Sequence, residues 1–398
     1  MARPLHLLVA SVTGAGFGIN AVKYAIPALL ALAGSAPSQI GAFTSSVAAA
    51  WPVFGLFAGL LLDRSSKLRV LRRGELTAVA GLLFILALYA TGTIALAILC
   101  IAGFALGAAE VLVDTSSQSI LPDIVRKQDL RPANSLLNGA KTVGVTLLAP
   151  VLVAALVDIQ PLAALAVAAL VLVVAFLLLS GLSEEATPRG NWRIADITNG
   201  LTLLMKAPVL RGLTLVLTVM SIAWGGWYVL IVSYVISAEG LGLSATAYGV
   251  VITMLGCGSL AGALAYGALH RTIGTRAVLA LDVVGTILFH AIPASGLGYV
   301  AVAISAFLAG IGGVVWVISV SAYQQAAVAG PMLGRAVASY RWIGWSAFFA
   351  GSIIAGPLAD HLGFAGAFAV FAALNVAMLI GFPFVVPNSQ VLDEPLVV

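Results

Sequence analysis

Long apolar runs alternate with short polar segments along the whole chain, and charge, proline or glycine bounds each run. A membrane-spanning helix needs about 20 apolar residues, and the runs have about that length or more. The pattern predicts twelve membrane helices, with ends placed to within about 2–4 residues. They cover 6–33, 38–62, 72–91, 94–120, 133–157, 161–181, 209–237, 244–269, 276–292, 297–325, 336–358 and 363–386.

The composition excludes two other classes of protein. Of the 398 residues, 61% are apolar and 9% are charged, whereas a soluble globular chain carries about 25% charged residues. Such a chain cannot cover a water-facing surface, so a soluble enzyme and a disordered chain are both excluded. Twelve helices with short loops would use about 300 to 340 residues, which leaves no room for a large catalytic or output domain. No enzyme activity is expected.

Basic residues gather in alternate loops. Sixteen of the 19 lie at the N-terminus or in every second loop, whereas the opposite loops hold Asp158, Glu239 and Asp360. Because cytoplasmic loops are enriched in Lys and Arg, this multi-pass chain is predicted to have both termini in the cytoplasm. The net charge of +4 follows from these loops and predicts no nucleic-acid partner.

The two halves of the chain share a local pattern. The sequence DRSSKLR at 63–69 follows one predicted helix, and HRTIGTR at 270–276 follows another at an offset of 207 residues. The same offset aligns Glu75 with Asp282. Two parallel six-helix repeats are an arrangement that transporters with alternating access use. The predicted fold is therefore an all-α polytopic membrane protein with twelve transmembrane helices in two such repeats.

A polar stretch separates the two repeats. We predict an N-terminal bundle over 1–181, a cytoplasmic linker over 182–208, and a C-terminal bundle with a short tail over 209–398. Within the linker, apolar side chains recur at helical spacing, which predicts a short interfacial amphipathic helix. These side chains are Ile194, Ile197, Leu201 and Leu204.

The first of the two matched loops carries a known signature. The sequence GLLLDRSSKLR at 59–69 resembles the helix 2–3 signature of the major facilitator superfamily, with Ser66 in place of the second glycine. A carboxylate beside several cations can hold helix ends together in one conformation and release them in another. The resemblance implies a cytoplasmic gate, and the alternative is a basic loop that only sets topology. The gate residues would be Gly59, Asp63, Arg64, Lys67 and Arg69.

Three further stretches, at 109–125, 130–136 and 207–211, resemble the bacterial drug and siderophore exporter branch, the group similar to enterobactin exporters and macrolide-efflux proteins. This resemblance implies a bacterial inner-membrane exporter. Its expected partners are a small organic substrate, protons and the lipid bilayer, and the protein is expected to be monomeric. The antiporter signature is reduced here to Ala149-Pro150-Val-Leu-Val-Ala154, and Asn20 stands about where relatives often carry an acidic residue.

Several charges lie inside predicted spans, where each costs about 2.5–3.5 kcal/mol or more. Glu110 and Lys141 both fall about 6 Å to the cytoplasmic side of mid-helix, on consecutive antiparallel helices, so an ion pair between them is predicted. Asp114 lies one turn from Glu110, and Lys23 lies near mid-membrane. These charges either couple protons to transport or form a buried salt bridge that locks helices.

The acidic pair is the candidate coupling site. Two nearby carboxylates in a cavity of low dielectric do not both stay ionised easily. The hypothesis is that Glu110 is the principal proton-coupling residue and Asp114 a secondary one, with Lys23 or Lys141 competing for its charge. Arg341 either takes part or extends its guanidinium to the cytoplasmic surface. Glu75 and Asp282 are expected to neutralise the nearby loop arginines.

Aromatic side chains gather in the second half of the chain. Trp224 and Trp316 lie well within two helices that the family resemblance places around a central cavity. Aromatic walls suit planar or amphipathic organic ligands and cations, whereas the alternative role for tryptophan is interfacial anchoring. The four histidines and two cysteines form no metal-ligand pattern, so no metal or cofactor is expected.

These observations favour proton-coupled antiport that exports a small organic compound by alternating access. Uptake by symport or facilitated diffusion is the alternative within transport, and the reduced signature at 149–154 supports it. A membrane receptor or scaffold without transport is disfavoured, because the chain has no soluble output domain and its charges gather in mid-membrane.

Overall fold

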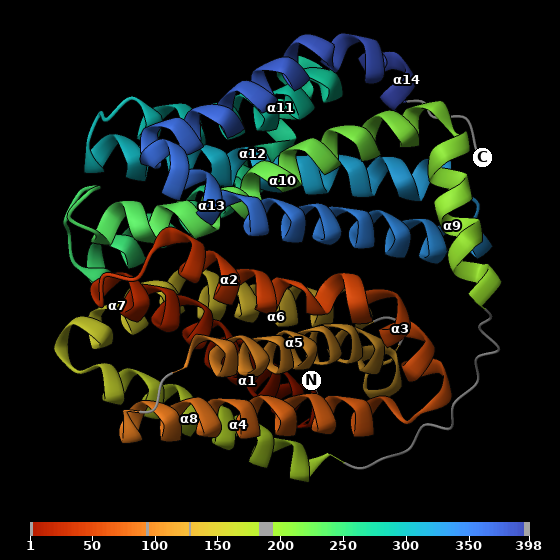
Figure 1. Ribbon diagram of the computed structural model, residues 1–398. Helices are drawn as coiled ribbons and strands as arrows, with labels where there is room; N and C mark the ends of the chain where they lie inside the picture. Colours follow the sequence, from red (N-terminus) through yellow and green to blue (C-terminus); the bar gives the residue numbers. More distant parts are fainter. Residues whose placement is uncertain (1–2, 93–94, 127–128, 183–193, 394–398) are drawn as a thin grey trace. The chain divides into compact units, whose positions relative to one another are not determined.

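The computed structural model describes residues 3–92, 95–126, 129–182 and 194–393 (Figure 1). The first half of the chain forms α-helices joined by short turns, and it includes a π-helical segment, η2, and a 3-10 segment, η3. Their bounds are α1 Arg3–Leu32, α2 Pro37–Ala48, α3 Ala50–Arg64, α4 Lys67–Thr91, α5 Leu96–Ile124, α6 Leu130–Lys141, η2 Thr142–Leu148, α7 Ala149–Ile159, α8 Pro161–Leu178 and η3 Leu179–Gly181.

The second half of the chain is also helical. The helix α9 lies where the linker was predicted to contain an amphipathic helix, although the side chains of Ile194 and Ile197 are outside the described residues. The bounds are α9 Ile194–Lys206, α10 Pro208–Ile236, α11 Ala245–Ala294, α12 Tyr299–Ala327, α13 Gly330–Val385 and α14 Ser389–Asp393.

The described helices account for twelve spans. By length and composition, nine helical stretches in the described residues could each cross a membrane, and one of them is α6, η2 and α7 taken together. Two of the nine, α11 and α13, are interrupted at Gly274 and Gly363, whose φ angles of 75° and 67° glycine adopts without steric cost. Each therefore contains two spans, and α2 with α3 supplies one more. The predicted fold of twelve transmembrane helices is confirmed.

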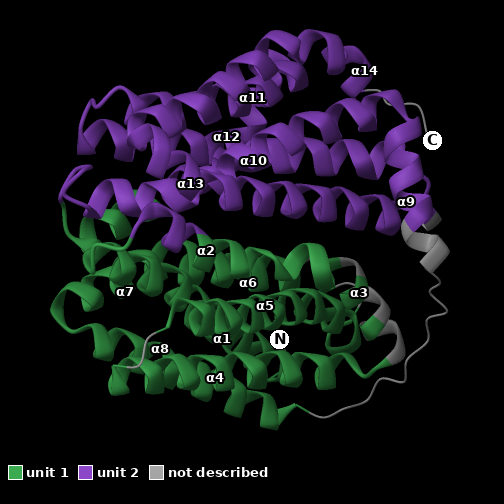
Figure 2. Ribbon diagram, viewed as in Figure 1, with its two compact units in different colours: residues 1–35, 42–192, 243–253 green, residues 36–41, 193–242, 254–398 purple. Residues whose placement is uncertain are grey.

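The chain forms two compact units (Figure 2). Unit 1 contains residues 1–35, 42–192 and 243–253, and unit 2 contains residues 36–41, 193–242 and 254–398. The start of α2 thus belongs with unit 2, and the start of α11 belongs with unit 1. In unit 1 the Asp158 carboxylate accepts hydrogen bonds from the backbone N–H groups of Ala245 (2.9 Å) and Thr246 (2.7 Å), and so caps the N-terminus of α11.

Small residues allow close helix contacts within each unit. In unit 1, a Cβ atom on Gly107 of α5 would lie 2.1 Å from the carbonyl oxygen of Val47 in α2. In unit 2, a Cβ atom on Gly258 of α11 would lie 1.9 Å from the carbonyl oxygen of Phe307 in α12. Close approach at small residues is how membrane helices gain packing energy without a hydrophobic driving force. These contacts fix the helices that carry the polar side chains described next.

Candidate functional site

Two lysine–carboxylate ion pairs lie within the apolar helices of unit 1. The Lys23 ammonium on α1 contacts both carboxylate oxygens of Glu110 on α5, at 2.9 and 3.1 Å. The Lys141 ammonium on α6 contacts Asp114 Oδ1 on α5 at 2.7 Å. The four side chains are 22–29% exposed, so each pair is largely withdrawn from solvent. The structure therefore brings all four predicted coupling residues into one polar cluster.

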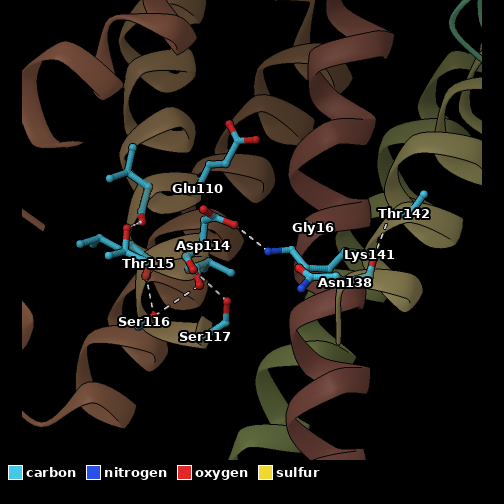
Figure 3. A network of polar contacts seen from close by, with 12 residues as sticks. Gly16, Glu110, Asp114, Thr115, Ser116, Ser117, Asn138, Lys141 and Thr142 are labelled. Atoms are coloured by element: carbon cyan, nitrogen blue, oxygen red, sulfur yellow. Dashed lines mark hydrogen bonds and ion pairs between the residues drawn. The ribbon is translucent and has the colours of Figure 1, made fainter. Parts of the chain in front are cut away.

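The pairing differs from the predicted one. Lys141 was expected to contact Glu110, but it contacts Asp114 instead (Figure 3). Glu110 is bound by Lys23. Glu110 and Asp114 are one helical turn apart on α5, and lysine has a long, flexible side chain. Helix depth alone therefore does not decide which of the two carboxylates a given lysine reaches.

Hydroxyl groups next to the acidic pair are satisfied within their own helix. The Thr115 hydroxyl donates to the carbonyl oxygen of Val111 at 2.7 Å, and the Ser117 hydroxyl donates to that of Asp114 at 3.0 Å (Figure 3). Such local bonds leave the carboxylates to the lysines. Asn20, one turn before Lys23, likewise donates its amide to the carbonyl oxygen of Gly16 at 2.9 Å.

A π-helical segment, η2, follows Lys141 directly. The Ala149 N–H bonds to the carbonyl oxygen of Gly144, five residues back, and the next residue, Pro150, has no N–H to continue the α-helical ladder. A Cβ atom on Gly144 would lie 2.7 Å from the Thr13 side chain, so η2 lies close against α1. Apolar periodicity did not predict this segment. Local π-helices recur at functional sites, and this one holds the end of α6 beside α1.

The predicted gate is described in part. The Lys67 ammonium contacts Asp123 Oδ2 at 2.9 Å and the carbonyl oxygen of Ser119 at 2.8 Å, both on α5. This cation therefore lies beside the C-terminal end of a helix, where the helix dipole favours it. The N–H of Arg69 lies 3.4 Å from Ser66 Oγ, the side chain that caps α4. Sequence analysis did not single out Asp123. The side chains of Asp63 and Arg64 and the surroundings of Gly59 are outside the part of the chain that the structure describes.

The structure corrects the expected role of Glu75 and Asp282. Glu75 is 0% exposed and accepts a hydrogen bond from the Ser11 hydroxyl at 2.7 Å. Asp282 is 2% exposed, and its Oδ1 has no hydrogen-bond partner among the described residues. The carboxylates of both residues are thus buried among the packed helices and do not neutralise the loop arginines.

The neighbouring arginines have backbone partners instead. The Arg72 guanidinium donates to the carbonyl oxygens of Leu179 (3.0 Å), at the start of η3, and Leu182 (2.8 Å), which caps η3. Arg276 donates to the carbonyl oxygen of Pro383 near the end of α13, at 3.0 Å. Carbonyl groups at a helix C-terminus lack intrahelical donors and carry partial negative charge, so they attract these guanidinium groups.

The predicted aromatic residues lie in unit 2. The Trp224 indole N–H donates to the Thr286 hydroxyl at 3.1 Å, and its ring lies 5.0 Å from that of Phe289. Trp316 is 3% exposed and donates to the Tyr340 hydroxyl at 3.0 Å, which places it in a packed core. Trp224 is only partly buried and is the one of the two that keeps accessible surface. Arg341 is an exposed residue of α13.

Comparison with known proteins adds the family. The profile described as "Major Facilitator Superfamily" matches residues 8–289. A solved nucleoside transporter is 15% identical, with a TM-score of 0.73 and coverage of 95% of this chain and 98% of that chain. A solved D-xylose–proton symporter is 15% identical, with a TM-score of 0.71 and coverage of 98% and 99%. No curated protein matches the chain. At these identities the solved structures show the fold alone.

Proposed function

The chain belongs to the Major Facilitator Superfamily, and from this premise we propose that it is a secondary active transporter that exports a small organic compound by alternating access in exchange for protons. Membership in this superfamily makes it a multi-pass membrane protein that transports small molecules. The observation that carries the finer proposal is the pair of adjacent lysine–carboxylate contacts on α1, α5 and α6.

Each ion pair can act as a proton-sensitive switch. A proton that binds Glu110 competes with the Lys23 ammonium, which contacts both carboxylate oxygens. The ionised pair carries no net charge, whereas the protonated pair carries the single positive charge of the lysine. In a low dielectric this charge acts strongly on nearby ions. Proton binding therefore disfavours a cationic substrate in the same cavity, and proton release favours it, which is the logic of antiport.

The second pair, Asp114 with Lys141, lies next to the π-helical segment. A change in the Lys141 contact would act on the junction of α6 and η2, and hence on α1, which packs against η2. Movement of one packed element past another is a common form of conformational switching. In this proposal Glu110 binds the transported proton, and Asp114 links the protonation state to the arrangement of the helices.

The direction of transport and the cellular setting are also proposals. Export, and a place in the inner membrane of a bacterium, are supported by the resemblance of stretches 109–125 and 130–136 to exporters. Both termini in the cytoplasm are supported by the positions of the basic loops. The contact of Lys67 with Asp123 and Ser119 supports a gate at that side, since it joins the start of α4 to the end of α5.

Facilitated diffusion is the second candidate, because both carboxylates already have lysine partners and need no proton for neutralisation. Flux in proteoliposomes separates the two. Compounds that raise the thermal stability of the purified protein serve as substrates, and their uptake into vesicles is followed with and without an imposed pH gradient. An antiporter accumulates substrate only with the gradient, whereas a facilitator equilibrates it regardless.

The residue test uses Glu110→Gln. This variant is expected to lose gradient-driven accumulation, by at least about tenfold if proton binding at this site drives the process, while it still binds substrate. The matched control is Asn138→Ala, which removes an exposed amide on α6, the helix that also carries Lys141, and it should keep accumulation. Full gradient-driven transport by Glu110→Gln would place the coupling elsewhere.

A further inference from the structure

Unit 2 contains a cleft of about 720 Å³ that the transport proposal does not use. It lies where the end of α9, the first turns of α10 and the end of α13 meet. One wall is very close-packed, because a Cβ atom on Gly212 would lie 1.9 Å from the carbonyl oxygen of Val385. The residues around the opening include Met205, Val209, Arg211, Leu215, Thr218 and Phe384.

The cleft is apolar and its apolar side chains are accessible. Phe384 is 89% exposed, Leu215 is 47% exposed and Met205 is 45% exposed. From Arg211 to Thr218 the α10 side of the cleft extends about 10 Å along the helix. An elongated apolar surface of this kind favours a hydrocarbon chain over water.

One end of the cleft is basic. Among the described residues that line it, Arg211 is the only charged one, and its side chain is exposed. Lys206, also exposed, follows the lining residue Met205 directly, and Arg276 donates to the carbonyl oxygen of the lining residue Pro383. One cation therefore lines the cleft, and two more lie next to residues that line it. Basic pockets between membrane helices attract anionic lipid headgroups.

We propose that this cleft binds an anionic phospholipid of the leaflet that faces the basic loops. One acyl chain lies along Val209, Leu215 and Phe384, and the phosphate lies at Arg211. The combination decides between ligands, because a free anion would leave the apolar surface unfilled and a zwitterionic lipid would bring its own cationic amine next to the basic residues. The site touches α9, α10 and α13 together, so a bound lipid ties α9 to the two helices beside it.

Native mass spectrometry can test the site. The protein is purified from vesicles of equimolar phosphatidylglycerol and phosphatidylcholine, and the retained lipids are counted. The wild type should retain phosphatidylglycerol preferentially, and Arg211→Gln should reduce that preference by about fivefold. Arg211→Lys should keep it. Arg271→Gln, which removes an exposed arginine outside the cleft, is the matched control and should behave as wild type.

A second variant tests the apolar half. Leu215→Trp replaces a leucine side chain in the cleft with a larger indole ring, so it should lower the retention of both lipids. Equal retention of the two lipids by the wild type would overturn the proposal, and so would Arg211→Gln behaving like Arg271→Gln. Displacement of phosphatidylglycerol by inorganic phosphate would also overturn it, because the site would then bind a free anion. A stable dimer that forms on lipid removal would overturn it as well, because the cleft would then belong to a second copy of the chain.

Discussion

The two six-helix repeats make up most of units 1 and 2, yet the polar side chains on their helices have different partners. In unit 1, lysines and carboxylates form the ion pairs Lys23–Glu110 and Lys141–Asp114. In unit 2, indole and imidazole groups bond to neutral acceptors. Trp224 donates to Thr286, and the His290 ring nitrogens lie 2.8 and 3.1 Å from the carbonyl oxygens of Thr286 and Ala223.

The difference teaches that repetition of a backbone does not repeat its chemistry. A charged pair can change its net charge when a proton arrives, whereas the Trp224 and Phe289 rings carry no titratable proton and offer surface and shape. Within the transport proposal, this assigns coupling to unit 1 and contact with an organic substrate to unit 2 at Trp224. The predictions that follow disturb one unit at a time.

The largest effect is expected from Lys23→Met in unit 1. The change leaves the Glu110 carboxylate without its cation among apolar helices. Removal of one partner of a buried ion pair lowers the free energy of unfolding by about 3–5 kcal/mol. Thermal unfolding in detergent measures the loss, and proteoliposome flux measures transport. The double variant Lys23→Met/Glu110→Gln removes both charges, so it should recover stability without recovering gradient-driven accumulation. Recovery of both would make the pair a structural lock only.

A large effect of a different kind is expected from Trp227→Ala in unit 2. Trp227 is fully buried and stacks on Phe289 with ring centroids 3.8 Å apart. Loss of such a side chain costs about 3–5 kcal/mol, and Trp227→Phe should cost much less. The protein that does fold with Trp227→Ala should still accumulate substrate in response to the pH gradient, whereas the Lys23→Met variant should not. Loss of that dependence would show that the two units do not divide the work in this way.

The sequence predicted the helices and the cluster of intramembrane charges, because apolar length and the cost of isolated charge are local properties. It did not predict which lysine contacts which carboxylate, because Glu110 and Asp114 are one turn apart on α5 and a lysine side chain is long enough to reach either. It also misplaced Glu75, whose partner Ser11 lies 64 residues away on another helix. Asp123 was missed because an acidic residue near a basic loop carries no distinctive spacing.

A moderate effect is expected from Lys67→Met at the end of unit 1. The ion pair with Asp123 is about one-third exposed, so its loss should cost at most about 1 kcal/mol of stability. Transport should fall more than stability does, because the contact joins α4 to α5 at the proposed gate. The control is Arg73→Gln, which removes an exposed basic side chain from the same helix and should leave flux unchanged. Equal flux in the two variants would separate Lys67 from gating.

The smallest effect is expected from Thr286→Val in unit 2, which keeps the shape of the side chain and removes the acceptor of the Trp224 indole N–H. Loss of one neutral hydrogen bond costs about 0.5–1.5 kcal/mol, so the unfolding temperature should fall slightly. Thr272→Val on the same helix, α11, removes a hydroxyl that bonds to carbonyl oxygens of its own helix, and it should have almost no effect.

If Trp224 contacts substrate, Thr286→Val should also change the apparent affinity for aromatic substrates without changing the response to the pH gradient. A change in that response with unaltered affinity would place Trp224 in the coupling machinery and remove the distinction between the two units.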